Sequence, residues 1–300
     1  MPFLLLLLIS VLAGLGAAFL TRRYPGGATA PAVVEVAREA GEHATGQAAQ
    51  RAARAARLDP ERATGLALTL ALLVIFVGGV LLALLAVVVR STDALAGIDS
   101  GVAEWGDRHT SAWTHDALTL VTQLGETWLV VVVAIVVAGV ELARTRSRWV
   151  APFLLAVILG DKLLTEAVKQ LIDRARPEIE AVAATLGPSF PSGHTSTAAA
   201  SWAAFALVAG RWWGRRSLPA LAGTAVGIAV AVALSRVFLD VHWLTDVLGG
   251  LALGWAWFAA CAIAFGGRLL SFGAPAQAAG RGAAEAASAE PPEAASRSRS

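Results

Sequence analysis

Cysteine and lysine are nearly absent from this chain of 300 residues. Cys261 is the only cysteine, which excludes an internal disulfide, and Lys162 and Lys169 are the only lysines, so the basic residues are almost all arginine. Charged residues make up only 15% of the chain, whereas about a quarter is usual for a soluble domain. With 56% hydrophobic residues, the composition excludes an ordinary soluble domain and predicts a protein that crosses a membrane several times. The net charge of +2 does not indicate a nucleic-acid partner.

Apolar runs of near-spanning length predict where the chain crosses the bilayer. The first run, 3–20, has no Lys or Arg before it, so we expect a transmembrane helix or signal anchor rather than a secretory signal. Six further runs predict core spans, at about 66–89, 120–142, 150–171, 195–210, 219–238 and 244–265. The predicted fold class is all-α, a polytopic membrane bundle of six core transmembrane helices plus an additional N-terminal membrane helix.

Shifts in composition divide the chain into four parts. We expect an N-terminal membrane helix or anchor at 1–21, a cytoplasmic linker at 22–62, the six-helix domain at 63–268 and a disordered cytoplasmic tail at 269–300. Asp59-Pro60 predicts the start of the first core helix, because proline is favoured in the first turn. Residues 90–116 are predicted to be a polar loop.

Arginine distribution predicts the orientation in the membrane. The turns at 143–149 and 211–216 hold three arginines each, whereas 90–116 has two arginines against five acidic residues. The positive-inside rule therefore places the two turns and the C-terminal tail in the cytoplasm. The loop at 172–190, the start of the fourth core span and the loop at 236–246 then share the outer face. We expect a multi-pass plasma-membrane protein with its polar site on the extracytoplasmic face.

The tetrapeptide Pro191-Ser192-Gly193-His194 stands where a predicted outer loop becomes the fourth core span. At a helix N-terminus, unpaired backbone N–H groups and the positive end of the helix dipole favour a bound phosphate. Gly193 lets the backbone approach the anion, Ser192 offers a hydroxyl donor, and His194 is expected about one turn into the helix, where it could give or take a proton. An ordinary helix cap explains the same tetrapeptide equally well.

A histidine, an aspartate and an arginine follow downstream. His242 and Asp246 are four positions apart, which predicts that they share one helical face. A carboxylate beside an imidazole fixes one tautomer and leaves the other nitrogen free as a nucleophile. Arg236 could fold back over the same space. The alternative is an interfacial His–Asp pair with an arginine that reaches lipid headgroups.

More positive charge lies upstream. Lys169 and Arg176 are seven positions apart and face one side if the helix persists, and Pro177 would end that helix. Arg174 is a candidate further donor, although its offset of two residues could point it elsewhere. The alternative is that these are the basic residues that flank most membrane spans, although such a cluster on an outer face runs against the positive-inside trend.

Together these segments predict a dianion site with a nucleophile, an orienting carboxylate and a second histidine. Three cations fit the equatorial oxygens of a transferring phosphoryl group: Lys169, Arg176 and Arg236. No His, Cys or carboxylate cluster has the spacing of metal ligands. We therefore expect no metal and no cofactor, with fixed cations in the place of a metal.

The three segments resemble the signature of the type 2 phosphatidic acid phosphatase superfamily. Its parts are Lys169-x6-Arg176-Pro177, Pro191-Ser192-Gly193-His194 and Ser235-Arg236-x5-His242-x3-Asp246, all intact and in the right order. The resemblance covers about 66–265 and the count of six helices, and the region 90–125, with Asp99, Trp105, Arg108 and Leu124-Gly125, is loosely similar to the family.

The resemblance implies a mechanism and a substrate class. His242 would attack phosphorus to give a phosphohistidine, Asp246 would polarise His242, and His194 would protonate the leaving oxygen and later activate water. The implied phosphate-binding residues are Lys169, Arg176, Ser192, Gly193 and Arg236. Relatives with this topology hydrolyse lipid phosphates or diphosphates without a metal, so the expected partners are a lipid phosphate and the bilayer. Phosphatidate, phosphatidylglycerophosphate, diacylglycerol diphosphate and undecaprenyl diphosphate remain alternative substrates.

Two other functions would use the same pocket. A transporter or scaffold could recognise lipid phosphates without hydrolysing them, but binding alone needs only the cations and not two histidines and an aspartate. Vanadium-dependent haloperoxidases belong to the same superfamily, but they are soluble, and six apolar spans argue against that activity.

Overall fold

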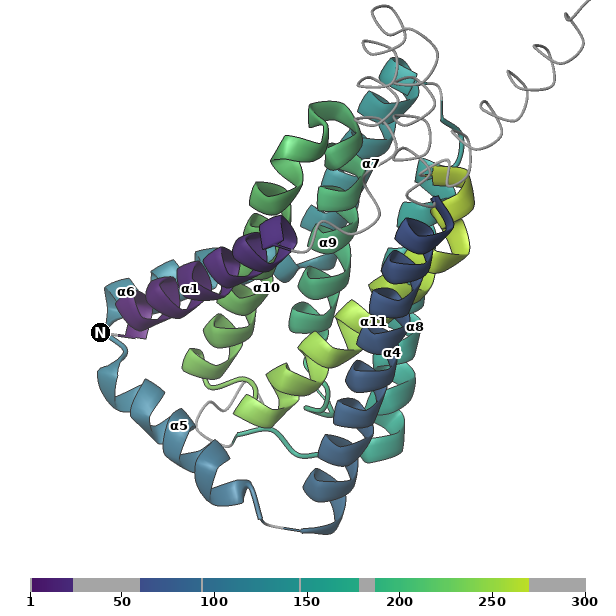
Figure 1. The fold of residues 1–300 in the computed structure, drawn as a ribbon. Coiled ribbons are helices and arrows are strands. Elements are labelled where there is room, and N and C mark those ends of the chain that lie inside the picture. The colour runs from purple at the N-terminus through teal and green to yellow at the C-terminus, as the bar shows by residue number, and fades with distance from the viewer. Residues whose placement is uncertain (1, 24–59, 93, 146, 178–186, 270–300) are drawn as a thin grey trace, which may run out of the picture. The chain divides into compact units, whose positions relative to one another are not determined.

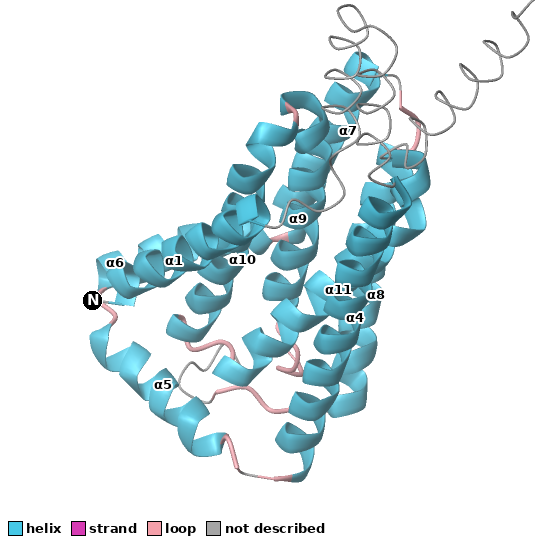
Figure 2. Ribbon diagram, viewed as in Figure 1, coloured by secondary structure: helices cyan, strands magenta, loops and turns pink. Residues whose placement is uncertain are grey.

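A computed structural model describes residues 2–23, 60–92, 94–145, 147–177 and 187–269. Within these ranges all regular structure is helical, which confirms the predicted all-α class (Figure 2). Residues 1–25 and 68–265 form one compact unit, and 26–67 with 266–300 form a second. The predicted linker and tail lie almost entirely outside the described residues, so both stay predictions, as do the domain boundaries.

Seven long helices occupy the described part of the chain (Figure 1): α1 (Pro2–Arg23), α4 (Pro60–Ser91), α7 (Thr127–Thr145), α8 (Val150–Ile172), α9 (Gly193–Trp213), α10 (Leu218–Phe238) and α11 (Leu244–Leu269). Five of them, α1, α4, α7, α10 and α11, are long and apolar enough to cross a membrane. The other two match the predicted third and fourth core spans but are more polar. In α8 this polarity comes from four charged side chains: Asp161, Lys162, Glu166 and Lys169.

The predicted loop at 90–116 is wrong, because two helices occupy most of it. These are α5 (Ala96–His109) and α6 (Ala112–Thr122), which are followed by the short 3-10 turn η1 (Gln123–Gly125). In α5 the buried residues Asp99, Ala103 and Gly106 recur at helical spacing. Two of the three are small and one is charged, while the larger apolar residues Val102 and Trp105 are only partly buried, so the amphipathic pattern is weak. The second core helix accordingly begins at Thr127, later than predicted.

Helix α1 packs lengthwise on α10 through small residues. A Cβ atom on Gly14 would lie 2.7 Å from the carbonyl oxygen of Gly223, so the two backbones touch at this crossing and no side chain fits between them. Near the start of α1, Leu6 is fully buried in an apolar cluster with Leu118, Val237 and Val247. The N-terminal membrane helix is therefore an integral part of this unit.

Helix α9 contacts α7, α8 and α10, and its first turn carries part of the predicted site. Helix α11 approaches that turn closely, since a Cβ on Gly250 would lie 2.7 Å from the carbonyl oxygen of Ser192. At the other end of α9, the buried carboxylate of Glu141 on α7 accepts hydrogen bonds from Arg211, at 2.9 Å, and from Trp212. Both ends of α9 are thus fixed, one by close backbone contact and one by a buried ion pair.

Candidate active site

The three sequence segments meet around one cavity of about 190 Å³. Its wall is formed by the start of α7, one face of α8, the first turns of α9, the end of α10 and the loops that follow α8 and α10. Six of the eight predicted site residues line it: Lys169, Arg176, Gly193, His194, Arg236 and His242. The other two, Ser192 and Asp246, are buried directly behind it.

His242 and Asp246 pair as predicted, although not on one helical face. His242 lies in the loop before α11, and Asp246 lies in the first turn of that helix. Oδ2 of Asp246 is 3.4 Å from Nδ1 of His242 and accepts a hydrogen bond from the backbone N–H of Trp243 at 3.0 Å. The aspartate therefore caps the start of α11 and orients the imidazole at the same time.

The other ring nitrogen of His242 faces a guanidinium. Nη1 of Arg176 lies 3.2 Å from Nε2, and because arginine can only donate, Nε2 accepts and Nδ1 carries the proton. Burial is the largest effect on this ring and lowers the pKa of His242 to about 3; Arg176 and Arg236 lower it further, while Asp246 raises it. The imidazole is thus neutral at physiological pH, with a lone pair on Nε2 at the cavity.

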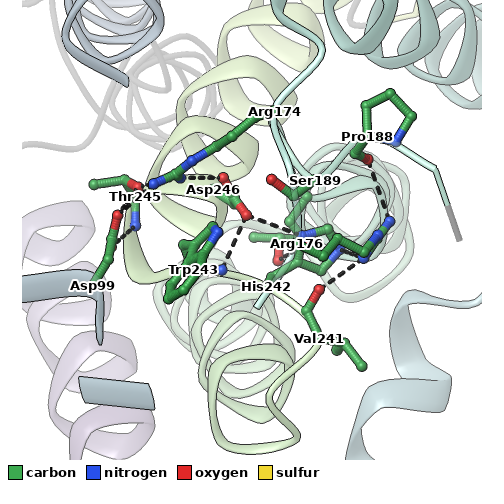
Figure 3. Close-up of polar contacts among 12 residues, drawn as sticks. Asp99, Arg174, Arg176, Pro188, Ser189, Val241, His242, Trp243, Thr245 and Asp246 are labelled. Carbon is green, nitrogen blue, oxygen red and sulfur yellow. Dashed lines mark hydrogen bonds and ion pairs between the residues drawn. The ribbon is translucent and has the colours of Figure 1, made fainter. Parts of the chain in front are cut away.

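Arg176 lies outside α8, which ends at Ile172, where Asp173 has a left-handed backbone with φ of 48°. The helix therefore does not persist to Arg176, yet the side chain reaches the cavity from the loop. Backbone carbonyls fix its guanidinium, with Nε bonded to Gly187 at 2.8 Å and Nη1 to Val241 at 2.7 Å (Figure 3). These bonds leave the charge in place whether or not an anion is bound.

Lys169 and Arg236 add two more positive groups to the cavity wall. Arg236 is only 9% exposed and lies in the last turn of α10, not in a loop. Its Nη1 donates to Thr122 at 3.2 Å, and its buried Nε has no hydrogen-bond partner among the described residues. A buried donor beside two further cations is a place for an anion's oxygen.

His194 is the second residue of α9, closer to the helix start than predicted. Its Nε2 lies 2.9 Å from Oε1 of Glu126, a residue that the sequence reasoning missed. Glu126 directly follows Gly125, and a Cβ on Gly125 would lie 2.6 Å from the carbonyl oxygen of His194. The glycine thus lets the turn before α7 approach the start of α9 and place a carboxylate beside the histidine.

Ser192 and Gly193 form the N-terminal end of α9. Gly193 lines the cavity, but Ser192 is fully buried, and its hydroxyl accepts a hydrogen bond from Thr195 at 3.0 Å. Its backbone N–H donates to the carbonyl oxygen of Asp246 at 3.0 Å, so Ser192 joins α9 to α11. A contact between the Ser192 hydroxyl and phosphate stays a prediction.

A second group of polar contacts lies behind Asp246 (Figure 3). Arg174 bridges Asp246 and Asp99, with Nη–Oδ distances of 2.6 Å and 2.7 Å. Thr245 donates to Asp99 through its backbone N–H and its hydroxyl. Arg174 had been a candidate phosphate donor, and Asp99 only a point of family likeness. The sequence does not indicate that Arg174 contacts Asp99 and Asp246, because more than 70 residues separate Arg174 from each of them.

The chain is similar to several known proteins. Residues 149–269 match the model of a family described as the PAP2 superfamily. Phosphatidylglycerophosphatase B of Bacillus subtilis is 31% identical over 168 residues, which are 54% of this chain and 81% of that protein. The crystal structure of a transmembrane PAP2-type phosphatidylglycerolphosphate phosphatase from Bacillus subtilis is similar with a TM-score of 0.57 and 26% identity, over 62% of this chain and 93% of that chain.

Two further relatives match a smaller part of their own length. Lipid A 1-phosphatase of Rhizobium johnstonii is 32% identical over 139 residues, 40% of this chain and 53% of that protein. The decaprenylphosphoryl-5-phosphoribose phosphatase of Mycobacterium tuberculosis is 34% identical over 132 residues, 42% of this chain and 65% of that protein. The names of these two relatives share one chemistry, removal of phosphate, and differ in the molecule that carries the phosphate.

Proposed function

This chain belongs to the PAP2 superfamily, and we propose that it is a membrane-embedded phosphatase that hydrolyses the phosphomonoester or diphosphate of a lipid. The observation that carries this proposal is the set of contacts that the two ring nitrogens of His242 make. Its Nε2 accepts from Arg176 at the cavity, and its Nδ1 faces Asp246. A neutral imidazole whose Nε2 lone pair faces the cavity, where Arg176 can leave it to bind the phosphate, is the arrangement that attack on a phosphoryl group requires.

In the proposed reaction, Nε2 of His242 attacks phosphorus while the bond from phosphorus to the lipid oxygen breaks. Arg176, Arg236 and Lys169 hold the oxygens of the pentacoordinate transition state, where the negative charge is spread. A water molecule then attacks the phosphohistidine, and inorganic phosphate leaves with His242 restored. The three cations supply the charge stabilisation, so the reaction is proposed to need no metal.

His194 is proposed to protonate the leaving lipid oxygen and later to take a proton from the attacking water. Its contact with Glu126 supports this role, because a carboxylate at 2.9 Å favours the proton on Nε2 that has to be donated. The two histidines thus differ at Nε2, which accepts from Arg176 in His242 and donates to Glu126 in His194.

The substrate is proposed to enter from the bilayer. Besides Lys169, helix α8 contributes Glu166, Thr165 and Lys162 to the cavity lining, so polar groups are available to contact the part of the lipid next to its phosphate. Other positions of α8 expose large leucines, as lipid contact requires: Leu155, Leu159, Leu163 and Leu171. This arrangement favours a lipid with a polar linker between its phosphate and its tails, as in phosphatidylglycerophosphate. The arginine distribution supports a site on the extracytoplasmic face, and the membrane is proposed to be the plasma membrane.

Phosphate release by the purified protein in detergent tests the proposal. With EDTA present, the wild type is expected to release phosphate from one or more of phosphatidate, phosphatidylglycerophosphate, undecaprenyl diphosphate and lipid A 1-phosphate, assayed side by side. His242→Ala should remove turnover, and His109→Ala is the matched control, because His109 is an exposed histidine at the end of α5. Full activity of His242→Ala would refute the mechanism, and binding without release from every lipid would favour a transporter or scaffold.

A further inference from the structure

Arg174 joins two buried carboxylates, one of which orients the proposed nucleophile. Its Nη1 donates to Oδ1 of Asp246 at 2.6 Å, and its Nη2 donates to Oδ2 of Asp99 at 2.7 Å. Asp246 and Asp99 are 0% and 1% exposed. The guanidinium forms a direct ion pair with each of the two carboxylates, and a buried carboxylate without a paired cation is costly.

The two oxygens of Asp246 have different partners. Oδ1 faces Arg174, while Oδ2 faces Nδ1 of His242 and the backbone N–H of Trp243 (Figure 3). Arginine therefore holds the carboxylate from the side opposite the imidazole. If the carboxylate turned to improve one of these contacts, it would weaken the other, so the orientation of His242 depends on where Arg174 is held.

Arg174 is itself fixed in three ways. Asp99 binds its Nη2 from α5, and Thr245 accepts from its Nη1 at 2.7 Å. Asp99 also accepts from the backbone N–H of Thr245 at 3.0 Å, which ties α5 to the start of α11. The ring of Trp243 lies 5.5 Å from the guanidinium carbon, within cation–π range. The guanidinium thus cannot pivot away from Asp246 without losing contacts to two other elements.

We propose that Arg174, anchored by Asp99, is a positioning residue that fixes Asp246 and through it the attacking nitrogen of His242. This inference rests on the proposed function and adds two residues to its machinery. Arg174 lies outside the cavity lining and both of its terminal nitrogens already bind carboxylates, so it is not a fourth phosphate ligand. The peripheral helix α5 thereby becomes part of the catalytic apparatus.

Arg174→Gln is expected to lower kcat about 10- to 100-fold, the usual effect of removing a partner behind a reacting group. KM for the lipid phosphate should change little, because Arg176, Arg236 and Lys169 still bind the phosphate. Arg174→Lys should recover only part of the loss, since an ammonium cannot bridge two carboxylates as the planar guanidinium does. Arg108→Gln is the matched control, an exposed arginine on α5 that pairs only with Glu104.

A double-mutant cycle separates positioning from simple stabilisation. In an Asp246→Asn background, Arg174→Gln should cost almost nothing more in kcat, because the orienting carboxylate is already lost. A purely structural residue would lower activity by the same factor in both backgrounds, and that result would overturn the proposal. The unfolding transition of each variant, followed by tryptophan fluorescence, gives its folded fraction, so that kcat refers to folded protein only.

A measurement without substrate keeps this inference apart from the proposed function. In protein labelled with ¹⁵N-histidine, His242 should show the Nδ1-protonated tautomer that Arg176 selects. Arg174→Gln should shift the Nδ1–H resonance of His242, because the hydrogen bond to Asp246 loosens, while Arg108→Gln should leave that resonance in place. If the wild type released phosphate from no lipid but this shift occurred, the function would fail and the positioning would stand. An unchanged Nδ1–H resonance in a folded Arg174→Gln variant would refute the positioning alone.

Discussion

Asp161 offers a test of how the start of α9 is held in place. This fully buried carboxylate on α8 accepts hydrogen bonds from the hydroxyls of Ser196 and Thr197, at 2.5 Å and 3.0 Å. Both hydroxyls lie in the turn that follows His194, and Thr197 also lines the cavity. Replacing Asp161 with alanine leaves two buried donors without their acceptor and frees the first turn of α9 from α8.

The expected cost follows from measured bonds between helices in membranes, which average about 0.6 and reach about 1.7 kcal/mol each. Two such bonds give a loss of about 1 to 3 kcal/mol for Asp161→Ala, a large share of the roughly 5 to 15 kcal/mol that stabilises a folded protein. Asp161→Asn keeps one acceptor oxygen and should lose about half as much. Because the loosened turn carries His194, kcat should fall as well.

Reversible unfolding in mixed micelles, followed by the fluorescence of the ten tryptophans, measures the loss. Asp116→Ala provides the control, since Asp116 is an exposed aspartate on α6. The expected order of stability is wild type, then Asp161→Asn, then Asp161→Ala. If Asp161→Ala cost no more than Asp116→Ala and kept the wild-type kcat, the bonds from α8 would not hold α9, and this reasoning would be wrong.

Three further predictions concern the site. The pKa of His242 is lowered from 6.5 to about 3, so between these values the unfolded chain takes up a proton that the folded protein does not. The free energy of unfolding should therefore be at its full value above pH 6.5 and fall by about 2 kcal/mol between pH 7 and pH 5. His242→Asn should remove this contribution to the pH dependence of the free energy of unfolding. Gly250→Ala puts a methyl group 2.7 Å from the carbonyl oxygen of Ser192 and should cost about 1 to 3 kcal/mol and much of kcat, whereas Gly79→Ala, with nothing within 4 Å, should cost neither. Glu126→Gln should slow the transfer of phosphate to His242 from lipid alkyl phosphates but spare that step with p-nitrophenyl phosphate, whose leaving group needs no proton; equal slowing of this step with both substrates would contradict the role of His194 as acid.

The sequence was informative where polar residues interrupt apolar runs. Lys169, His194, Arg236 and His242 stand beside spans that are otherwise apolar, and an ionised group there is expensive, so their gathering could be predicted. The family resemblance implied which histidine attacks, and that role stays a prediction. Most boundaries of the long helices also followed from apolar length, because the bilayer sets that length whatever the tertiary contacts are. Helix α7, which begins at Thr127 instead of 120, is an exception.

Contacts between distant segments could not be predicted in the same way. Asp99 and Arg174 meet across 75 positions and Glu126 and His194 across 68, and no local pattern encodes such pairs. The sequence predicted a loop at helix α5 because the fully buried positions of this helix hold two small residues and an aspartate. That aspartate, Asp99, pairs with Arg174, which is distant in the sequence. The packing of α1 on α10 likewise depends on Gly14 and Gly223, which come into backbone contact only when the two helices are packed together.

The charges of α8 have a consequence for how this protein is made. Asp161 and Lys162 lie near the middle of the helix, and each would cost about 2.5 to 3.5 kcal/mol there if α8 entered a bilayer alone. The hydroxyls of α9 bind Asp161 only when both helices are in the membrane together. Stable integration of α8 therefore depends on the arrival of α9, which brings His194 with it. In this chain, membrane insertion and assembly of the reaction centre are parts of one folding event.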